Sequence, residues 1–155
     1  MFGFGVKSKA KKLMNVITEF SEILAGRNEV FPSGGSVSEI ECVLVGMACF
    51  LVVGFAGDNN LAFELVPTYQ KKIMPTVNKQ EYDNKTQLVQ KYFSEYRENA
   101  ITIQESGKDW FTPMVDKFAE LTARNFNVEF TTDCHAMLCA CVLQLISIIN
   151  PKLNV

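Results

Sequence analysis

Two long apolar segments stand out in the pattern of hydrophobic and polar positions. Residues 42–56 contain no polar side chain, and residues 134–149 contain only His135, Gln144 and Ser147. A helix that is apolar on every side is usually buried on every side. We therefore predict two central helices, at about residues 36–56 and 132–149.

The rest of the chain shows apolar residues at three- and four-residue steps, which is typical of amphipathic helices. Pro67 lies inside one of these segments and is expected to kink or split it. Residues 125–130 could be briefly extended, but they do not predict a sheet. The expected amphipathic helices are at about 7–25, 60–74, 84–103 and 113–124.

Helix starts are predicted from residues whose side chains accept a backbone N–H. Ser36 with Glu39 three residues later has the spacing of a capping box. A proline directly after a capping residue, as in Thr112-Pro113, is typical of the first turn of a helix. The expected caps are Ser36, Asn59 or Asn60, Asp83, Thr112 (with Asp109 as a competitor) and Thr131 or Thr132.

These elements predict one all-α domain over residues 1–155, a compact bundle of about six helices with the amphipathic helices wrapped around the two central ones. A chain of this length buries roughly 70% of its unfolded surface, which is enough for one real core. The sequence leaves open whether residues 1–8 are ordered or flexible.

The apolar segments also raise the alternative of a membrane hairpin. A run of 15 or 16 residues spans about 24 Å as a helix, short of the roughly 30 Å hydrocarbon core. Acidic residues precede both runs, at Glu41 and Asp133. Buried core helices are therefore favoured over insertion.

Charge and cysteine content indicate which partners and which cellular compartment to expect. The net charge is −2, which argues against nucleic-acid binding by phosphate neutralisation. The five cysteines lie inside apolar patterns and not at disulfide spacings. The N-terminal residues lack the apolar core of a signal peptide. We therefore expect a cytoplasmic protein with free thiols.

Residues Cys134, His135, Cys139 and Cys141 lie on one predicted helix and suggest zinc, whose ligands include thiolate and imidazole. They divide between two faces, so Cys42 or Cys49 would have to complete a site. His135 and Cys139 are four residues apart and could form a nucleophile pair, but the apolar surroundings favour an inert thiol. We expect no metal, no cofactor and no enzyme activity.

Aromatic residues cluster around one predicted helix junction, where they could form a core or a contact surface. The favoured hypothesis is a small protein-interaction module, such as an adaptor, inhibitor, immunity-type or regulatory protein, which could also self-associate. The predicted contact residues are Tyr92, Tyr96, Trp110 and Phe111.

Two other functions stay open. The first is a carrier or sensor that holds a hydrophobic small molecule between the central helices. Small residues would leave a cavity there, although they would equally allow close helix packing. The second is a membrane-associated protein whose basic first helix lies on the lipid. The small residues are Gly46, Ala48, Gly54, Ala136 and Ala140.

Overall fold

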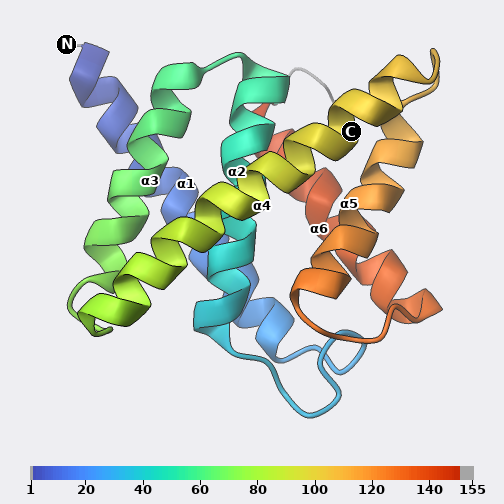
Figure 1. Cartoon of the computed structure of the whole chain (residues 1–155), viewed down its shortest axis with the longest axis horizontal. Helices are drawn as coiled ribbons and strands as arrows, with labels where there is room; N and C mark the ends of the chain where they lie inside the picture. The colour runs from blue at the N-terminus through green and yellow to red at the C-terminus, as the bar shows by residue number, and fades with distance from the viewer. Residues whose placement is uncertain (1, 151–155) are drawn as a thin grey trace.

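The computed structural model describes residues 2–150, with side chains from Gly5 onward. The described residues form six α-helices and no strand, which confirms the predicted all-α bundle (Figure 1). The helices are α1 (Phe2–Ala25), α2 (Val37–Ala56), α3 (Asn59–Ile73), α4 (Lys79–Glu105), α5 (Phe111–Asn125) and α6 (Thr132–Ile149).

Helix α2 is the centre of the bundle. It contacts α1, α3, α4 and α6, and every residue from Ile40 to Val52 is buried. Helix α4 crosses α2 obliquely on one side, while α1 and α6 lie on the other (Figure 1). An apolar surface on all sides of α2 requires neighbours on all sides, and the amphipathic helices supply them.

The second apolar helix, α6, is also central to the fold, but it buries only one face. That face packs on α5 and α2, whereas Ala136, Ala140, Gln144 and Ile148 are exposed. By length and composition alone, both apolar helices could cross a membrane. In the most apolar stretch of α2, 72% of the residues are buried inside the protein, and in that of α6 the share is 33%.

Helices α2 and α6 begin where the sequence predicts. The Ser36 hydroxyl accepts the Glu39 N–H at 3.3 Å and caps α2. The Thr131 hydroxyl accepts the Cys134 N–H at 3.1 Å and caps α6. Gly57 ends α2 in the left-handed conformation, with φ 61°, which glycine adopts at little cost.

Three predicted starts are wrong. Helix α3 is capped by Asp58 and not by either asparagine that follows it. Helix α4 is capped by Asn78, five residues before the predicted Asp83. The residues between them are polar, so the apolar pattern did not reveal the first turn. Helix α5 begins at Phe111 without a side-chain cap, so neither Thr112 nor Asp109 caps it.

The structure also bears on three smaller expectations about the backbone. Helix α3 continues through Pro67 and is not split. Residues 126–131 form a turn followed by a loop and no strand, with Asn127 at φ 56°. Residues 2–8, whose order the sequence left open, are the first turns of α1, while residue 1 lies outside the described range.

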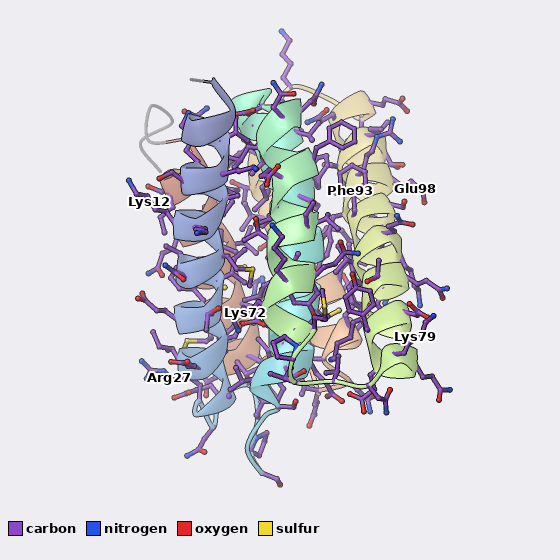
Figure 2. All side chains as sticks on the ribbon, turned by 90° about the vertical axis from the view of Figure 1, so that its left-hand side faces the viewer. Lys12, Arg27, Lys72, Lys79, Phe93 and Glu98 are labelled. Carbon is purple, nitrogen blue, oxygen red and sulfur yellow. The ribbon has the colours of Figure 1, made fainter. Side chains whose placement is uncertain are left out.

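A buried carboxylate joins three helices. Glu41 of α2 is 4% exposed and accepts the Thr18 hydroxyl of α1 at 2.8 Å. It also accepts Lys72 Nζ of α3 at 2.9 and 3.1 Å, and Lys72 lies on the side of α3 that faces α1 (Figure 2). A buried charge is tolerated when it is paired and hydrogen-bonded, as it is here. These contacts hold α1 and α3 together against α2.

Candidate functional site

The four predicted contact residues do not form one surface. Tyr96 is fully buried, and its ring packs edge-on against Phe118 at 4.9 Å. Its hydroxyl lies 2.7 Å from that of Thr122, which itself donates to the Phe118 carbonyl, so Tyr96 is the donor of the pair. Tyr92 is 9% exposed and packs against α2. Both tyrosines belong to the core.

The other two residues lie at the start of α5, where they cover the C-terminal end of α2. Trp110 and Phe111 are half-buried, and each ring centroid lies 6.1 Å from that of Phe55. Their contact with each other is edge-on at 5.9 Å. Trp110, Phe111 and Phe55 therefore form an aromatic cluster where the start of α5 meets the end of α2.

A groove lies between α3 and α4, with α2 as its floor; we call it the α3/α4 groove. Its volume is about 610 Å³. The two helices meet at the turn after Ile73 and diverge from there (Figure 1). Figure 2 shows Phe93 of α4 in the space between α3 and α4. The groove is lined by Cys49 and Val53 of α2, by Asn59, Ala62, Phe63, Val66, Pro67 and Gln70 of α3, and by Val89, Gln90 and Phe93 of α4.

Gly46 determines how close the α4 wall lies to the α2 floor. A Cβ atom at this position would lie 2.5 Å from Tyr92 Cβ, 3.1 Å from the Val89 carbonyl oxygen and 3.4 Å from the Phe93 nitrogen. Only glycine lets the α4 backbone approach α2 this closely. The groove wall formed by Val89 and Phe93 is therefore positioned by a glycine on the opposite helix.

The small residues predicted to leave a cavity between α2 and α6 do not line this groove. The space beside Gly46 is occupied by α4, and Ala48 is buried. Ala136 and Ala140 face solvent. The close packing at Gly46 is with α4 and not with the other central helix, α6.

The groove lining is apolar with a few neutral amides. Asn59, Gln70 and Gln90 are its polar side chains, and none of the lining residues is charged. Gln70 donates to the Thr86 hydroxyl at 3.3 Å, which ties α3 to α4 near the turn that joins them. Phe63 is 79% exposed, the most exposed large apolar side chain in the described range. Apolar walls with a few fixed polar groups are typical of binding sites.

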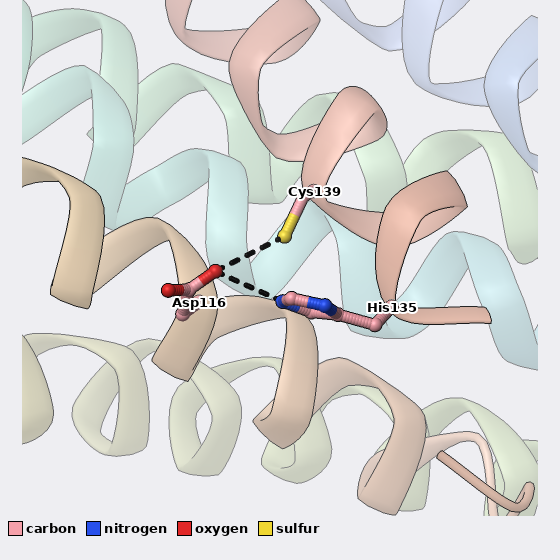
Figure 3. A group of neighbouring side chains, drawn as sticks. All are labelled: Asp116, His135 and Cys139. Atoms are coloured by element: carbon pink, nitrogen blue, oxygen red, sulfur yellow. Dashed lines mark hydrogen bonds and ion pairs between the residues drawn. The ribbon is translucent and has the colours of Figure 1, made fainter. Parts of the chain in front are cut away.

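A second cluster, which we call the Asp116 cluster, joins α5 to α6 (Figure 3). His135 Nε2 lies 2.9 Å from Asp116 Oδ1, and the Cys139 thiol donates to the same oxygen at 3.6 Å. His135 and Cys139 are one turn apart on α6, as the sequence predicts. Asp116 comes from the preceding helix, so spacing along α6 alone could not reveal it. The three ligand atoms lie within 4.8 Å of one another.

The electrostatics of this cluster oppose nucleophilic catalysis. Burial, the hydrogen bond to Asp116 and the charge of Asp116 together raise the pKa of Cys139 to about 11. The thiolate is the nucleophilic form, so this cysteine is protonated and unreactive near neutral pH. The expectation of an inert thiol agrees with this direction.

The other cysteines lie in the core, where the Cys42 thiol donates to the Lys85 carbonyl at 3.6 Å. Cys42, Cys49, Cys134 and Cys141 are buried and free. Burial raises the pKa of Cys49 and of Cys141 to about 12. The metal-ligand group in the described part of the chain does not include Cys42 or Cys49, which the sequence suggested as completing ligands.

Comparison of the chain with protein-family models, with curated proteins and with solved structures returns no match.

Proposed function

We propose that this protein is an interaction module that binds an amphipathic helix of a partner protein in the α3/α4 groove. The observation that carries the proposal is an open apolar groove beside the strongly exposed ring of Phe63. A large apolar surface that stays exposed in the free protein marks a site of interaction. Aromatic residues are enriched at the centres of protein interfaces.

The lining chemistry supports a helix as the occupant. A helix that binds in a groove inserts apolar side chains from positions i, i+3 or i+4, and i+7. Val53, Val66 and Val89 come from three different helices and would contact such a row of side chains. The amides of Asn59 and Gln90 would hydrogen-bond polar groups along its edge. Because no lining residue is charged, binding should depend only weakly on salt concentration.

A second candidate is the carriage of a hydrophobic small molecule in the same groove. The volume of about 610 Å³ favours it, because sites for small molecules span roughly 300–1,000 Å³. A carrier buries most of its ligand, however, whereas the Phe63 ring points mainly into solvent. The helix is therefore the occupant that we propose.

The five free cysteines support the proposal that the protein acts in a reducing compartment, the cytoplasm. An adaptor, an inhibitor, an immunity-type protein and a regulatory protein all require a binding surface of this kind. Identifying the partner would separate these roles.

The test uses the full chain and a displayed library of amphipathic helical peptides. Selected peptides are synthesised, and their dissociation constants are measured by titration calorimetry. Phe63→Asp should weaken binding about 30-fold or more, because hot-spot residues contribute roughly 2 kcal/mol or more. Ile23→Asp is the matched control, since it places the same charge on an exposed apolar position of α1, outside the groove.

Equal affinity for the wild type and Phe63→Asp would refute the groove as the peptide site. Native mass spectrometry of the purified protein addresses the second candidate, because a retained small molecule adds mass that denaturation removes. An added mass that Phe63→Asp abolishes, with no peptide selected, would replace the helix by a small molecule as the occupant.

A further inference from the structure

The Asp116 cluster brings together three kinds of metal-binding side chain. The carboxylate, the imidazole and the thiol come from two adjacent helices, and their ligand atoms lie within 4.8 Å of one another. His135 is 40% exposed and Asp116 is 53% exposed, so an ion can reach them from solvent. The cluster lies on α5 and α6, and none of its residues lines the α3/α4 groove.

We propose that Asp116, His135 and Cys139 bind a zinc ion that links α5 to α6. Thiolate and imidazole nitrogen select zinc over magnesium and calcium, which prefer oxygen ligands. The charges also match, because one carboxylate, one thiolate and a neutral imidazole balance Zn²⁺. Binding displaces the thiol proton of Cys139, which passes to solvent.

The two distances to Asp116 Oδ1 can be compared with those of a tetrahedral zinc site. Bonds of 2.0–2.2 Å to nitrogen and oxygen, and of about 2.3 Å to sulfur, place neighbouring ligands about 3.4 Å (N to O) and about 3.6 Å (S to O) apart. The Cys139 sulfur lies 3.6 Å from Asp116 Oδ1, as required. The His135 nitrogen, at 2.9 Å from the same oxygen, has to move outward by about 0.5 Å, which a half-exposed ring can do.

The local structure holds the ligands ready for such an ion. His135 and Cys139 are one helical turn apart, so α6 presents both on one face. The Phe130 ring packs edge-on against the His135 ring at 5.1 Å and limits its rotation. Three protein ligands leave a fourth position for water. An ion there would add metal–ligand bonds between two helices that already pack on each other and whose polar contact in this cluster runs through Asp116 Oδ1.

Cobalt(II) titration of the reduced full-length protein tests the site, with zinc as the competitor. Tetrahedral cobalt bound to a thiolate gives intense visible bands and a sulfur-to-metal charge-transfer band. We expect both bands to appear and zinc to abolish them. At zinc concentrations about 100-fold above the dissociation constant, the melting temperature should rise by about 5–10 °C.

Cys139→Ser should abolish the charge-transfer band, and His135→Gln and Asp116→Asn should each weaken zinc binding at least about tenfold. Asp133→Asn is the matched control, because it removes an exposed carboxylate from the same end of α6 and should bind zinc as the wild type does. Circular dichroism shows whether each variant is folded. If Cys139→Ser does not fold, His135→Gln decides the question.

Three results would overturn the proposal. The first is the absence of a cobalt–thiolate band in the wild type. The second is unchanged zinc affinity in the folded Cys139→Ser and His135→Gln variants. The third is an equal loss of affinity in Asp133→Asn, which would reveal only general attraction to acidic residues. None of these results affects the α3/α4 groove.

Discussion

The contact between Gly46 and α4 makes the strongest prediction about packing. In Gly46→Ala the new methyl group would lie 2.5 Å from Tyr92 Cβ, where carbon atoms in contact are normally about 3.5–4.0 Å apart. Tyr92 Cβ is fixed to the helix backbone and cannot rotate away. Helix α4 would therefore have to move away from α2 by about 1 Å or more.

The size of the effect follows from two opposing contributions. Overpacking a core typically costs about 1–3 kcal/mol, and a clash with a backbone-fixed atom belongs at the upper end. Alanine in a helix interior is about 1 kcal/mol more favourable than glycine. The free energy of unfolding should therefore fall by about 2 kcal/mol, which lowers the melting temperature by about 4–8 °C.

Gly54→Ala in the same helix is the matched control. There the added methyl group would meet only the far end of the Phe50 ring, at 3.0 Å, on an exposed part of α2. The helix preference should dominate, so the free energy of unfolding should stay the same or rise by up to about 1 kcal/mol.

Thermal and urea unfolding followed by circular dichroism measure both variants. A stable Gly46→Ala protein, or the same sign of change in both variants, would refute the close-packing argument. A further consequence concerns the groove, because the atoms that crowd the new methyl group include the backbone of Val89 and Phe93. Gly46→Ala should therefore also change the affinity for a peptide selected on the wild type.

Three further predictions concern buried polar groups. Tyr96→Phe should lower the free energy of unfolding by about 1 kcal/mol, because it removes the buried hydrogen bond to the Thr122 hydroxyl; an unchanged free energy in denaturant melts would contradict this. Glu41→Gln should lower the free energy of unfolding by about 1–2 kcal/mol in the same melts, because it weakens the hydrogen bonds to α1 and α3. An unchanged free energy would mean that the charge of Glu41 contributes nothing to stability. Thiol labelling of Cys139 should be slow at pH 8 and accelerate toward pH 11, because burial and Asp116 raise its pKa to about 11. Asp116→Asn should lower the pKa of Cys139 and speed its labelling at pH 8. An unchanged labelling rate would exclude the Asp116 carboxylate as a cause of the raised pKa.

The sequence alone determined the class of fold and the central helices. The apolar run in α2 calls for apolar neighbours on every side, and Ser36 and Thr131 cap the two apolar helices where the local spacing predicts. These features depend on residues within one or two turns of each other. Local chemistry is therefore sufficient to predict them.

Tertiary structure decided which surfaces are available. The sequence grouped Tyr92 and Tyr96 with Trp110, but exposure depends on which helix packs over each side chain, and that is a property of the assembled bundle. The start of α4 was missed because its first turn is polar, and polar turns resemble loops in the apolar pattern.

Both candidate sites arise from residues that only the packing brings together. The α3/α4 groove depends on three helices, and its wall is positioned by Gly46, whose role depends on what lies opposite it. Asp116 reaches His135 and Cys139 across the α5–α6 interface, although it is 19 and 23 residues away in sequence. Periodicity reports which face of a helix is apolar, whereas contact between helices depends on their crossing geometry. The helices could therefore be predicted from the sequence, and the sites between them could not.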